Sequence, residues 1–230
     1  MPLAEFRARG GGLADNPDGW GLAWREPGGF RLEKEPVPGS DSSRFQDLID
    51  ELASDLIVAH VRKARFPPVN TVANTHPFLR DCCGRRWAFA HNGLVPEVVA
   101  LEEENHGRVC APEGQTDSEF AFCHLLSHAT RHFGHDVADW PAVLGAVSEA
   151  IARHGKFNFL LSDGEHLIAY GHDRLHYSES GEAVLVATEP LGGEAGWTPF
   201  APGELRIWRD GERVQRIETH PPAPTIGILP

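Results

Sequence analysis

The stretch "AFAHNGLVPE", residues 88–97, decides how the chain is interpreted. Its first residues are apolar and suit a buried strand, which leads into His91, Asn92 and Gly93 and then into Pro96. We expect a turn here that brings an imidazole, an amide and a bare backbone N–H together at one strand end. Asn92 and Gly93 could serve only the turn, by adopting left-handed conformations. The combination otherwise predicts a chemical role.

Length and charge restrict the class of protein. The 230 residues favour a single domain, residues 1–230, with an extended proline-rich tail at 220–230. With 33 acidic and 21 basic residues the formal charge is −12, which argues against a nucleic-acid partner. The sequence contains neither a long apolar run nor a signal or lipidation pattern at "MPLAEFRARGGG". We therefore expect a cytoplasmic protein with no membrane partner.

The four cysteines are expected to be thiols. No CxxC motif occurs, and the adjacent pair Cys82 and Cys83 cannot easily form a bridge with itself. Cys110 is expected in a loop and Cys123 on a helix. We therefore predict no disulfide framework.

Hydrophobic periodicity predicts an α+β fold. The expected helices are 42–54, 116–133 and 140–155. The expected strands include a hairpin over 19–36, two apolar strands at 56–62 and 87–93, and a later antiparallel series at 157–163, 166–172, 174–179, 183–190, 204–210 and 213–220. Strands, then helices, then more strands favour layered α+β architecture over alternating βαβ units.

Five motifs occur in a specific order along the chain. They are "NPDGWGLAW" (16–24), "AHVRKA" (59–64), "NTHPF" (74–78), "AHNG" (90–93) and "GQTDSE" (114–119). Together they resemble the glutaminase domain of the class II glutamine amidotransferases, which are N-terminal-nucleophile hydrolases. The resemblance spans roughly residues 10 to 200, and "FNFLLSDG" and "ATEPL" are most similar to a stand-alone branch that includes γ-glutamyl amidohydrolases.

The resemblance implies a fold and an activity. The fold would be a four-layer α/β/β/α sandwich, here without its first strand, and the reaction would hydrolyse the γ-amide of glutamine or of a γ-glutamyl compound. A missing first strand would leave an unpaired sheet edge beside the pocket, and such edges favour association, for example into a homo-oligomer. No cofactor and no metal are expected, and the partner is a small-molecule substrate.

The resemblance also implies roles for individual residues. Asn92 and Gly93 would form the oxyanion hole, Arg62 would bind the substrate α-carboxylate, and Asp117 would bind its α-ammonium group. His76 would line the pocket in a positional role. For Asp117 a plainer explanation is the preference for acidic residues at helix N-termini.

One departure from the family concerns the nucleophile. Family members begin Met-Cys, whereas this sequence begins Met-Pro, so the nucleophilic cysteine lies outside the sequence given. A late start or a trimmed chain is one explanation, and a true loss of catalysis is the other; we favour the first. In the second case the chain would be an inactive γ-glutamyl-binding or interaction module.

Two readings from other classes are less favoured. Pro2 could act as the base of a tautomerase, but the flanking residues do not resemble that family. His124, His128 and His132 are spaced four apart and could ligate zinc. We favour a solvated helix face, because no carboxylate or cysteine at ligand spacing completes a site.

Overall fold

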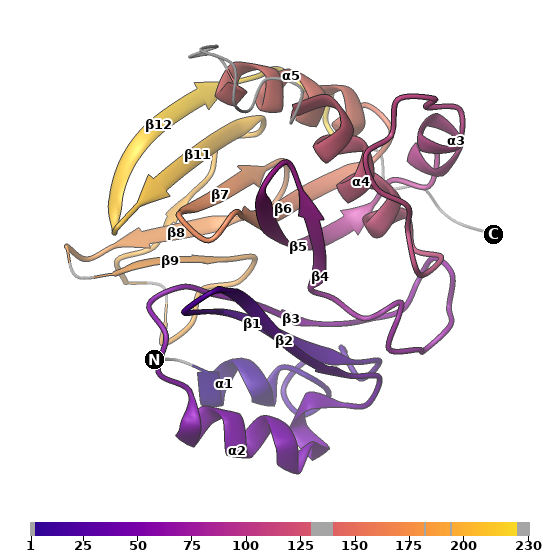
Figure 1. Ribbon diagram of the computed structural model, residues 1–230. Coiled ribbons are helices and arrows are strands. Elements are labelled where there is room, and N and C mark those ends of the chain that lie inside the picture. Colours follow the sequence, from indigo (N-terminus) through magenta and orange to yellow (C-terminus); the bar gives the residue numbers. More distant parts are fainter. Residues whose placement is uncertain (1–2, 130–139, 182, 194, 225–230) are drawn as a thin grey trace.

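Figure 1 shows the computed structural model, which describes residues 3–129, 140–181, 183–193 and 195–224. Its helices are α1 (Leu3–Ala8), η1 (Gly39–Asp41, a 3-10 helix), α2 (Ser43–Glu51), α3 (Val98–Glu103), α4 (Asp117–Ala129) and α5 (Trp140–Ala152). Its strands are β1 (Trp20–Glu26), β2 (Gly29–Glu35), β3 (Ile57–Val61), β4 (Phe78–Cys82), β5 (Arg85–Leu94), β6 (Lys156–Ser162), β7 (His166–Gly171), β8 (His176–Glu179), β9 (Val184–Ala187), β10 (Thr198–Pro199), β11 (Glu204–Arg209) and β12 (Glu212–Glu218).

The elements form four layers. Helices α1 and α2 cover the outer face of the sheet β2-β1-β3, and helices α3 to α5 cover the outer face of the sheet β12-β11-β7-β6-β5-β4 (Figure 1). A third sheet, β10-β8-β9, lies beside the first, and every strand pair is antiparallel. The predicted α+β class and the four-layer α/β/β/α sandwich are confirmed.

The predicted helices agree with the structure where it describes them. The Ser42 hydroxyl caps α2 by accepting from the Phe45 N–H at 3.1 Å, and Phe45 is fully buried against Trp20, with ring centroids 4.5 Å apart. Helix α4 begins at Asp117, where the Thr116 hydroxyl accepts from the Glu119 N–H. The last residues of the helix predicted over 116–133 lie outside the described ranges.

The turn predicted at residues 91–93 is wrong. Strand β5 continues through Leu94, with Asn92 opposite Asn158 and Gly93 opposite Phe157 on β6. Neither Asn92 nor Gly93 has a positive φ, which removes the explanation that they serve a left-handed turn. Glycine is required at 93 for a different reason, because a Cβ atom there would lie 1.8 Å from the Lys156 carbonyl oxygen.

Each of the three sheets has two edge strands, which are β2 and β3, β10 and β9, and β12 and β4. Within the described ranges β3 pairs with β1 alone, and β9 pairs with β8 alone. The predicted unpaired edge in the first sheet is therefore observed at β3, and the residues described ahead of β1 form helix α1 instead of a strand.

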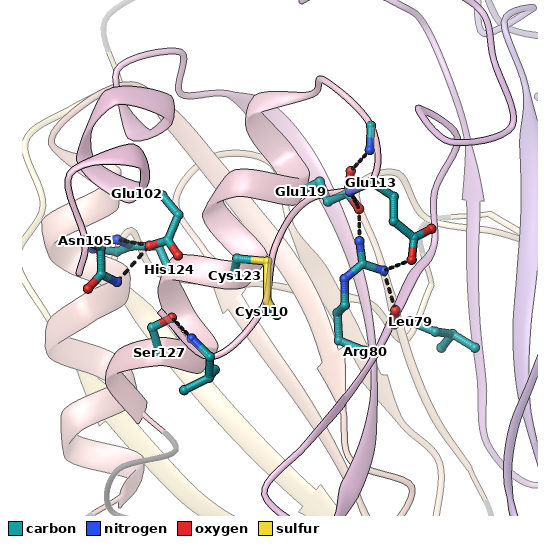
Figure 2. Close-up of a disulfide and its surroundings, with 12 residues drawn as sticks. Leu79, Arg80, Glu102, Asn105, Cys110, Glu113, Glu119, Cys123, His124 and Ser127 are labelled. Carbon is teal, nitrogen blue, oxygen red and sulfur yellow. Dashed lines mark hydrogen bonds and ion pairs between the residues drawn. A yellow bond between two sulfur atoms is a disulfide. The ribbon is translucent and has the colours of Figure 1, made fainter. Parts of the chain in front are cut away.

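The structure corrects the prediction that all four cysteines are thiols. Cys110, in the loop after α3, and Cys123, on α4, form a disulfide with a Cα–Cα distance of 5.6 Å (Figure 2). Sequence spacing could not reveal this pair, because only the tertiary fold brings the loop against the helix. The bridge joins residues 13 apart and so closes the loop that leads into Asp117.

We expect this disulfide to stabilise the fold. A bridge closing a loop of this length contributes about 2–4 kcal/mol, chiefly by restricting the unfolded chain. Cys110→Ala should therefore lower the free energy of unfolding by about that amount in denaturant titrations without reductant. With reductant present, the free energy of unfolding of the unsubstituted chain should fall close to that of the variant.

Cys83→Ala provides the matched control, since Cys83 is exposed and lies outside the bridge. Because the bridge is intact in this variant, reductant should lower its free energy of unfolding by the same amount as in the unsubstituted chain. Equal stability of the unsubstituted chain with and without reductant would contradict a structural role for the bridge.

Candidate active site

One large cavity receives every residue to which the sequence assigned a site role. It has a volume of about 1230 Å³ and lies where the ends of β3 and β5 approach each other. Its lining includes Arg62, His76, Asn92, Gly93 and Asp117. The structure therefore brings together residues that lie up to 55 positions apart in the sequence (117 − 62).

Arg62 follows directly after β3 and is 3% exposed. Its Nη1 atom donates to the Val69 carbonyl at 3.2 Å and to the Asn70 Oδ1 atom at 3.0 Å. Burial lowers the pKa of Arg62, although the negative charges of Asp18 and Asp117 oppose that shift. Within the described part of the chain no carboxylate forms an ion pair with Arg62. A buried guanidinium in this state is suited to a carboxylate ligand.

Asp117 is the first residue of α4 and is also 3% exposed. Its Oδ2 atom accepts from the Val95 N–H at 2.7 Å and its Oδ1 atom from the Ser118 N–H at 2.8 Å. Burial nevertheless raises the pKa of Asp117 to about 6, because these hydrogen bonds and the charge of Arg62 offset only part of the desolvation. An acidic residue can interact favourably with a helix N-terminus while it remains exposed. The helix N-terminus alone therefore does not explain why Asp117 is buried.

Three imidazoles near the cavity are held in the neutral form. Burial lowers the pKa of His60 to about 3, that of His91 to about 4, and that of His76 well below its ordinary value. The His76 ring stacks on His60 at 4.2 Å, and neither His76 nitrogen has a hydrogen-bond partner in the described structure. His60, His76 and His91 are therefore neutral near pH 7.

His60 was not singled out from the sequence, although it lines the cavity. A usable signal was present, because residues two apart on a strand share a face, and His60 precedes Arg62 by two. The His91 ring contacts the Ser118 hydroxyl at 2.8 Å and the Lys156 carbonyl at 3.2 Å. These contacts connect the end of β5 to α4 and β6.

Asn158 is a second residue that the sequence did not reveal. It is 1% exposed, lines the cavity, and donates from Nδ2 to the Asn92 carbonyl at 3.0 Å. Its Oδ1 atom accepts from the His172 and Asp173 N–H groups, both at 2.8 Å. Asn158 thus fixes the backbone at Asn92. The only clue was a polar residue within the apolar run "FNFLL".

The structure gives no support to a metal site on the histidine face of α4. The His124 and His128 rings lie at a tilt to each other with their centroids 4.3 Å apart, and His124 Nδ1 lies 3.0 Å from the buried Glu102 carboxylate (Figure 2). This face is thus partly buried against α3 and not simply solvated. No group of three or more metal-ligating side chains occurs among the described residues, and His132 lies outside them.

Two further observations concern the cysteines and the helices. None of the four cysteines is among the residues that line the cavity, although all four are described. Within the described ranges, no helix is sufficiently long and apolar to cross a membrane.

Comparison with known proteins identifies the family. Residues 1–181 match the family model of the class II glutamine amidotransferases. The chain is also 35% identical over 236 aligned positions to YafJ of Escherichia coli (strain K12), a protein assigned by name to the glutamine amidotransferases, with 90% of each chain covered. The chain therefore belongs to the class II glutamine amidotransferase family.

Solved structures and a more distant relative agree. A predicted glutamine amidotransferase from Pseudomonas aeruginosa PA01 has 31% identity and a TM-score of 0.68, with 90% of this chain and 91% of that chain covered. The gamma-glutamyl-hercynylcysteine sulfoxide hydrolase of Mycobacterium tuberculosis (strain H37Rv) is 27% identical over 184 positions, covering 79% of this chain and 71% of that protein. The fold is shared by the glutamine phosphoribosylpyrophosphate amidotransferase of Bacillus subtilis, with a TM-score of 0.67 and 19% identity. That comparison covers 94% of this chain and 45% of the Bacillus subtilis chain.

The raised pKa of Asp117 can be measured directly. We expect its carboxyl to titrate near pH 6 in the folded chain, against about 3.9 when unfolded. Because the folded pKa is the higher one, the neutral form contributes stability that is present below about pH 4 and is lost as the pH rises through about 6.

Carboxyl chemical shifts followed by NMR would give the midpoint, with Asp117→Asn identifying the resonance. The free energy of unfolding relative to Asp117→Asn should fall between about pH 4 and pH 7. A midpoint at or below pH 4 would contradict the expected desolvation.

Proposed function

We propose that this chain is an amidohydrolase of the glutamine amidotransferase type, acting on the γ-amide of L-glutamine or of a γ-glutamyl compound. One observation carries the proposal. A buried guanidinium at Arg62 with no carboxylate partner in the described structure lines the same cavity as the buried carboxylate of Asp117. These two charges complement the carboxylate and the ammonium group of a free α-amino acid end.

The proposed reaction follows from the remaining cavity residues. A thiolate attacks the side-chain amide carbon, and the negative charge that develops on the amide oxygen is stabilised by the Asn92 side-chain N–H and the Gly93 backbone N–H. Collapse of this intermediate forms a thioester and expels ammonia or an amine, and water then hydrolyses the thioester. His76 would shape the pocket as a neutral ring and transfer no proton.

The thiol must come from a group other than the four cysteines described above. We propose an N-terminal cysteine whose own α-amine is the base, as the family relationship implies. The open edges of β3 and β9 support this idea, since residues of both strands line the cavity. An extended segment seated between them could pair with both edges and present its first residue to the substrate.

The nature of the substrate draws support from the relatives. YafJ is named as a glutamine amidotransferase, and the Mycobacterium tuberculosis relative as a hydrolase of a gamma-glutamyl compound. Both names refer to a substrate with a glutamyl α-amino acid end. That end is the part for which Arg62 and Asp117 are suited.

Binding of the α-carboxylate can be tested on the chain as given. Arg62→Ala should weaken L-glutamine or L-glutamate binding at least about tenfold, because a charge-assisted pair contributes about 1.5–3 kcal/mol. Arg62→Lys should restore little, because an ammonium group cannot reproduce the two-point fork. Isothermal titration calorimetry gives the affinities.

Arg153→Ala is a suitable control, since Arg153 pairs with Glu149 on the exposed surface and does not line the cavity. Arg153→Ala should bind L-glutamine or L-glutamate with the same affinity as the unsubstituted chain. Unchanged affinity in Arg62→Ala would contradict the assignment of the carboxylate to Arg62.

The oxyanion hole can be tested in a chain extended so that it begins with cysteine. Asn92→Ala should leave the dissociation constant nearly unchanged and lower kcat by about 10²–10³, because its donor acts on charge that develops in the transition state. Glutaminase kinetics measure both effects. Full activity of Asn92→Ala would refute this role, whereas ligand binding without turnover in the cysteine-containing chain would favour a binding module.

A further inference from the structure

We propose that Asp18 and Asn70 form a relay that positions the Arg62 guanidinium for the α-carboxylate of the ligand. This inference rests on the proposed function. Neither residue was assigned a role from the sequence, and neither is among the residues that line the cavity. Both would act through Arg62, as positioning residues.

The Asn70 amide contacts a charge at each end. Its Nδ2 atom donates to Asp18 Oδ1 at 3.0 Å, and its Oδ1 atom accepts from Arg62 Nη1 at 3.0 Å. An ionised carboxylate can only accept hydrogen bonds, so Asp18 requires the NH₂ end of the amide. The oxygen end is thereby directed at Arg62. With the amide reversed, donors would face donors at Arg62 and acceptors would face acceptors at Asp18.

Asp18 is itself fixed to the backbone on both sides of Arg62. Its Oδ2 atom accepts from the Ala64 N–H at 2.8 Å, and its own N–H donates to the Arg62 carbonyl at 2.9 Å. The Arg62 N–H in turn donates to the Gly19 carbonyl at 2.8 Å. The segment "DGWG", which begins at Asp18 and leads into β1, is therefore held against the end of β3, independently of any ligand.

The charge state of Asp18 agrees with this arrangement. Burial raises the pKa of Asp18, but the hydrogen bonds from Asn70 and Ala64 and the charges of Arg62 and Lys63 outweigh that effect and leave the pKa lowered. Asp18 is therefore ionised at neutral pH. Its negative charge favours a charged Arg62 without forming an ion pair with it.

The neutral amide between the two charges has a specific consequence. If Asp18 contacted Arg62 directly, it would occupy the guanidinium fork that a ligand carboxylate needs. Instead, Arg62 is held through Nη1 alone, by Asn70 and the Val69 carbonyl. In the described structure Nε and Nη2 have no hydrogen-bond partner, so one two-donor edge is available to a carboxylate.

A competing explanation is that Asn70 merely anchors its loop. The two explanations differ in ligand selectivity. A relay that acts on Arg62 affects only ligands with an α-carboxylate, whereas a loosened loop weakens all ligands of the pocket. The test therefore compares L-glutamine with its alcohol analogue, in which CH₂OH replaces the α-carboxylate.

Affinities of both ligands would be measured by calorimetry on the full chain. Asn70→Ala and Asp18→Asn should each weaken L-glutamine binding about three- to tenfold and leave the alcohol analogue within about twofold. The Asp18→Asn effect arises because the Ala64 N–H and Asn70 donate to different oxygens of Asp18, and in asparagine an NH₂ group would face one of these two donors. Asp18→Asn keeps the size and shape of the side chain, so it keeps the test decisive if Asn70→Ala does not fold.

The double variant should be non-additive and bind L-glutamine about as weakly as Asn70→Ala alone, because both changes break one relay. Val72→Ala, in the same loop and 51% exposed, is the control and should bind both ligands normally.

Equal loss of affinity for both ligands, or additive effects in the double variant, would overturn the relay while leaving the proposed function intact. Failure of the unsubstituted chain to bind L-glutamine or L-glutamate would overturn both.

Discussion

The site depends on how closely the two main sheets approach each other. Small side chains fill the interface near the cavity, where Ala23 and Val58 of the first sheet meet Ala88 and Ala90 of the second, all nearly or fully buried. Face-to-face sheets normally lie about 10 Å apart, and larger residues here would separate β3 from β5. Arg62 comes from the end of one strand and Asn92 from the other, so their meeting at one cavity requires this packing.

The same tight packing extends to the segment that carries His76. A Cβ atom at Gly21 would lie 2.2 Å from the His76 carbonyl oxygen, so this position on β1 has no room for a side chain. On the neighbouring strand, Lys34 Nζ donates to the Thr75 carbonyl at 2.6 Å. The glycines of the "DGWG" motif therefore serve the placement of the "NTHPF" motif, which explains in physical terms why the two motifs occur together.

Two pairs of opposite charges, in which Glu119, Arg62 and Asp117 are buried and Arg80 is partly buried, differ in their contacts. Glu119, which is 1% exposed, forms an ion pair with Arg80 (Figure 2). It also accepts from the Gly114 N–H at 2.7 Å. Arg62 and Asp117 are equally buried but make no ion pair with each other. A buried charge without a direct partner costs stability. Glu119 and Arg80 are thus each other's partner, whereas the lack of an ion pair between Arg62 and Asp117 agrees with the ligand contacts that we propose for them.

The sequence predicted those features that depend on local pattern. Amphipathic spacing and a serine cap located α2, apolar runs located β5 and β6, and ordered motifs indicated the residues around the cavity. For features that depend on pairing between distant segments, the sequence led to either no prediction or a wrong one. The strand continues through Gly93 because β6 lies beside it, and Cys110 reaches Cys123 because its loop folds back on α4.

The residues that position the cavity groups also depend on contacts between distant segments, which the sequence does not reveal. Asn158 and Asn70 each contact a cavity residue through one end of an amide and backbone or a carboxylate through the other. Neither role has a sequence signature, because asparagine is common in loops and the partners lie on other segments. Only coordinates reveal which amide orientation satisfies both ends.

The electrostatics of the cavity restrict the mechanism that the fold can support. His60, His76 and His91 are all neutral near pH 7, and desolvation makes protonation of any of them costly during a reaction. Arg62 remains protonated, and Asp117 is committed to two backbone N–H groups. The three imidazoles and Arg62 are therefore poorly suited to accept a proton from a thiol and return it to a leaving amine. An N-terminal nucleophile avoids this requirement, because the thiol and the α-amine that acts as its base belong to the same residue.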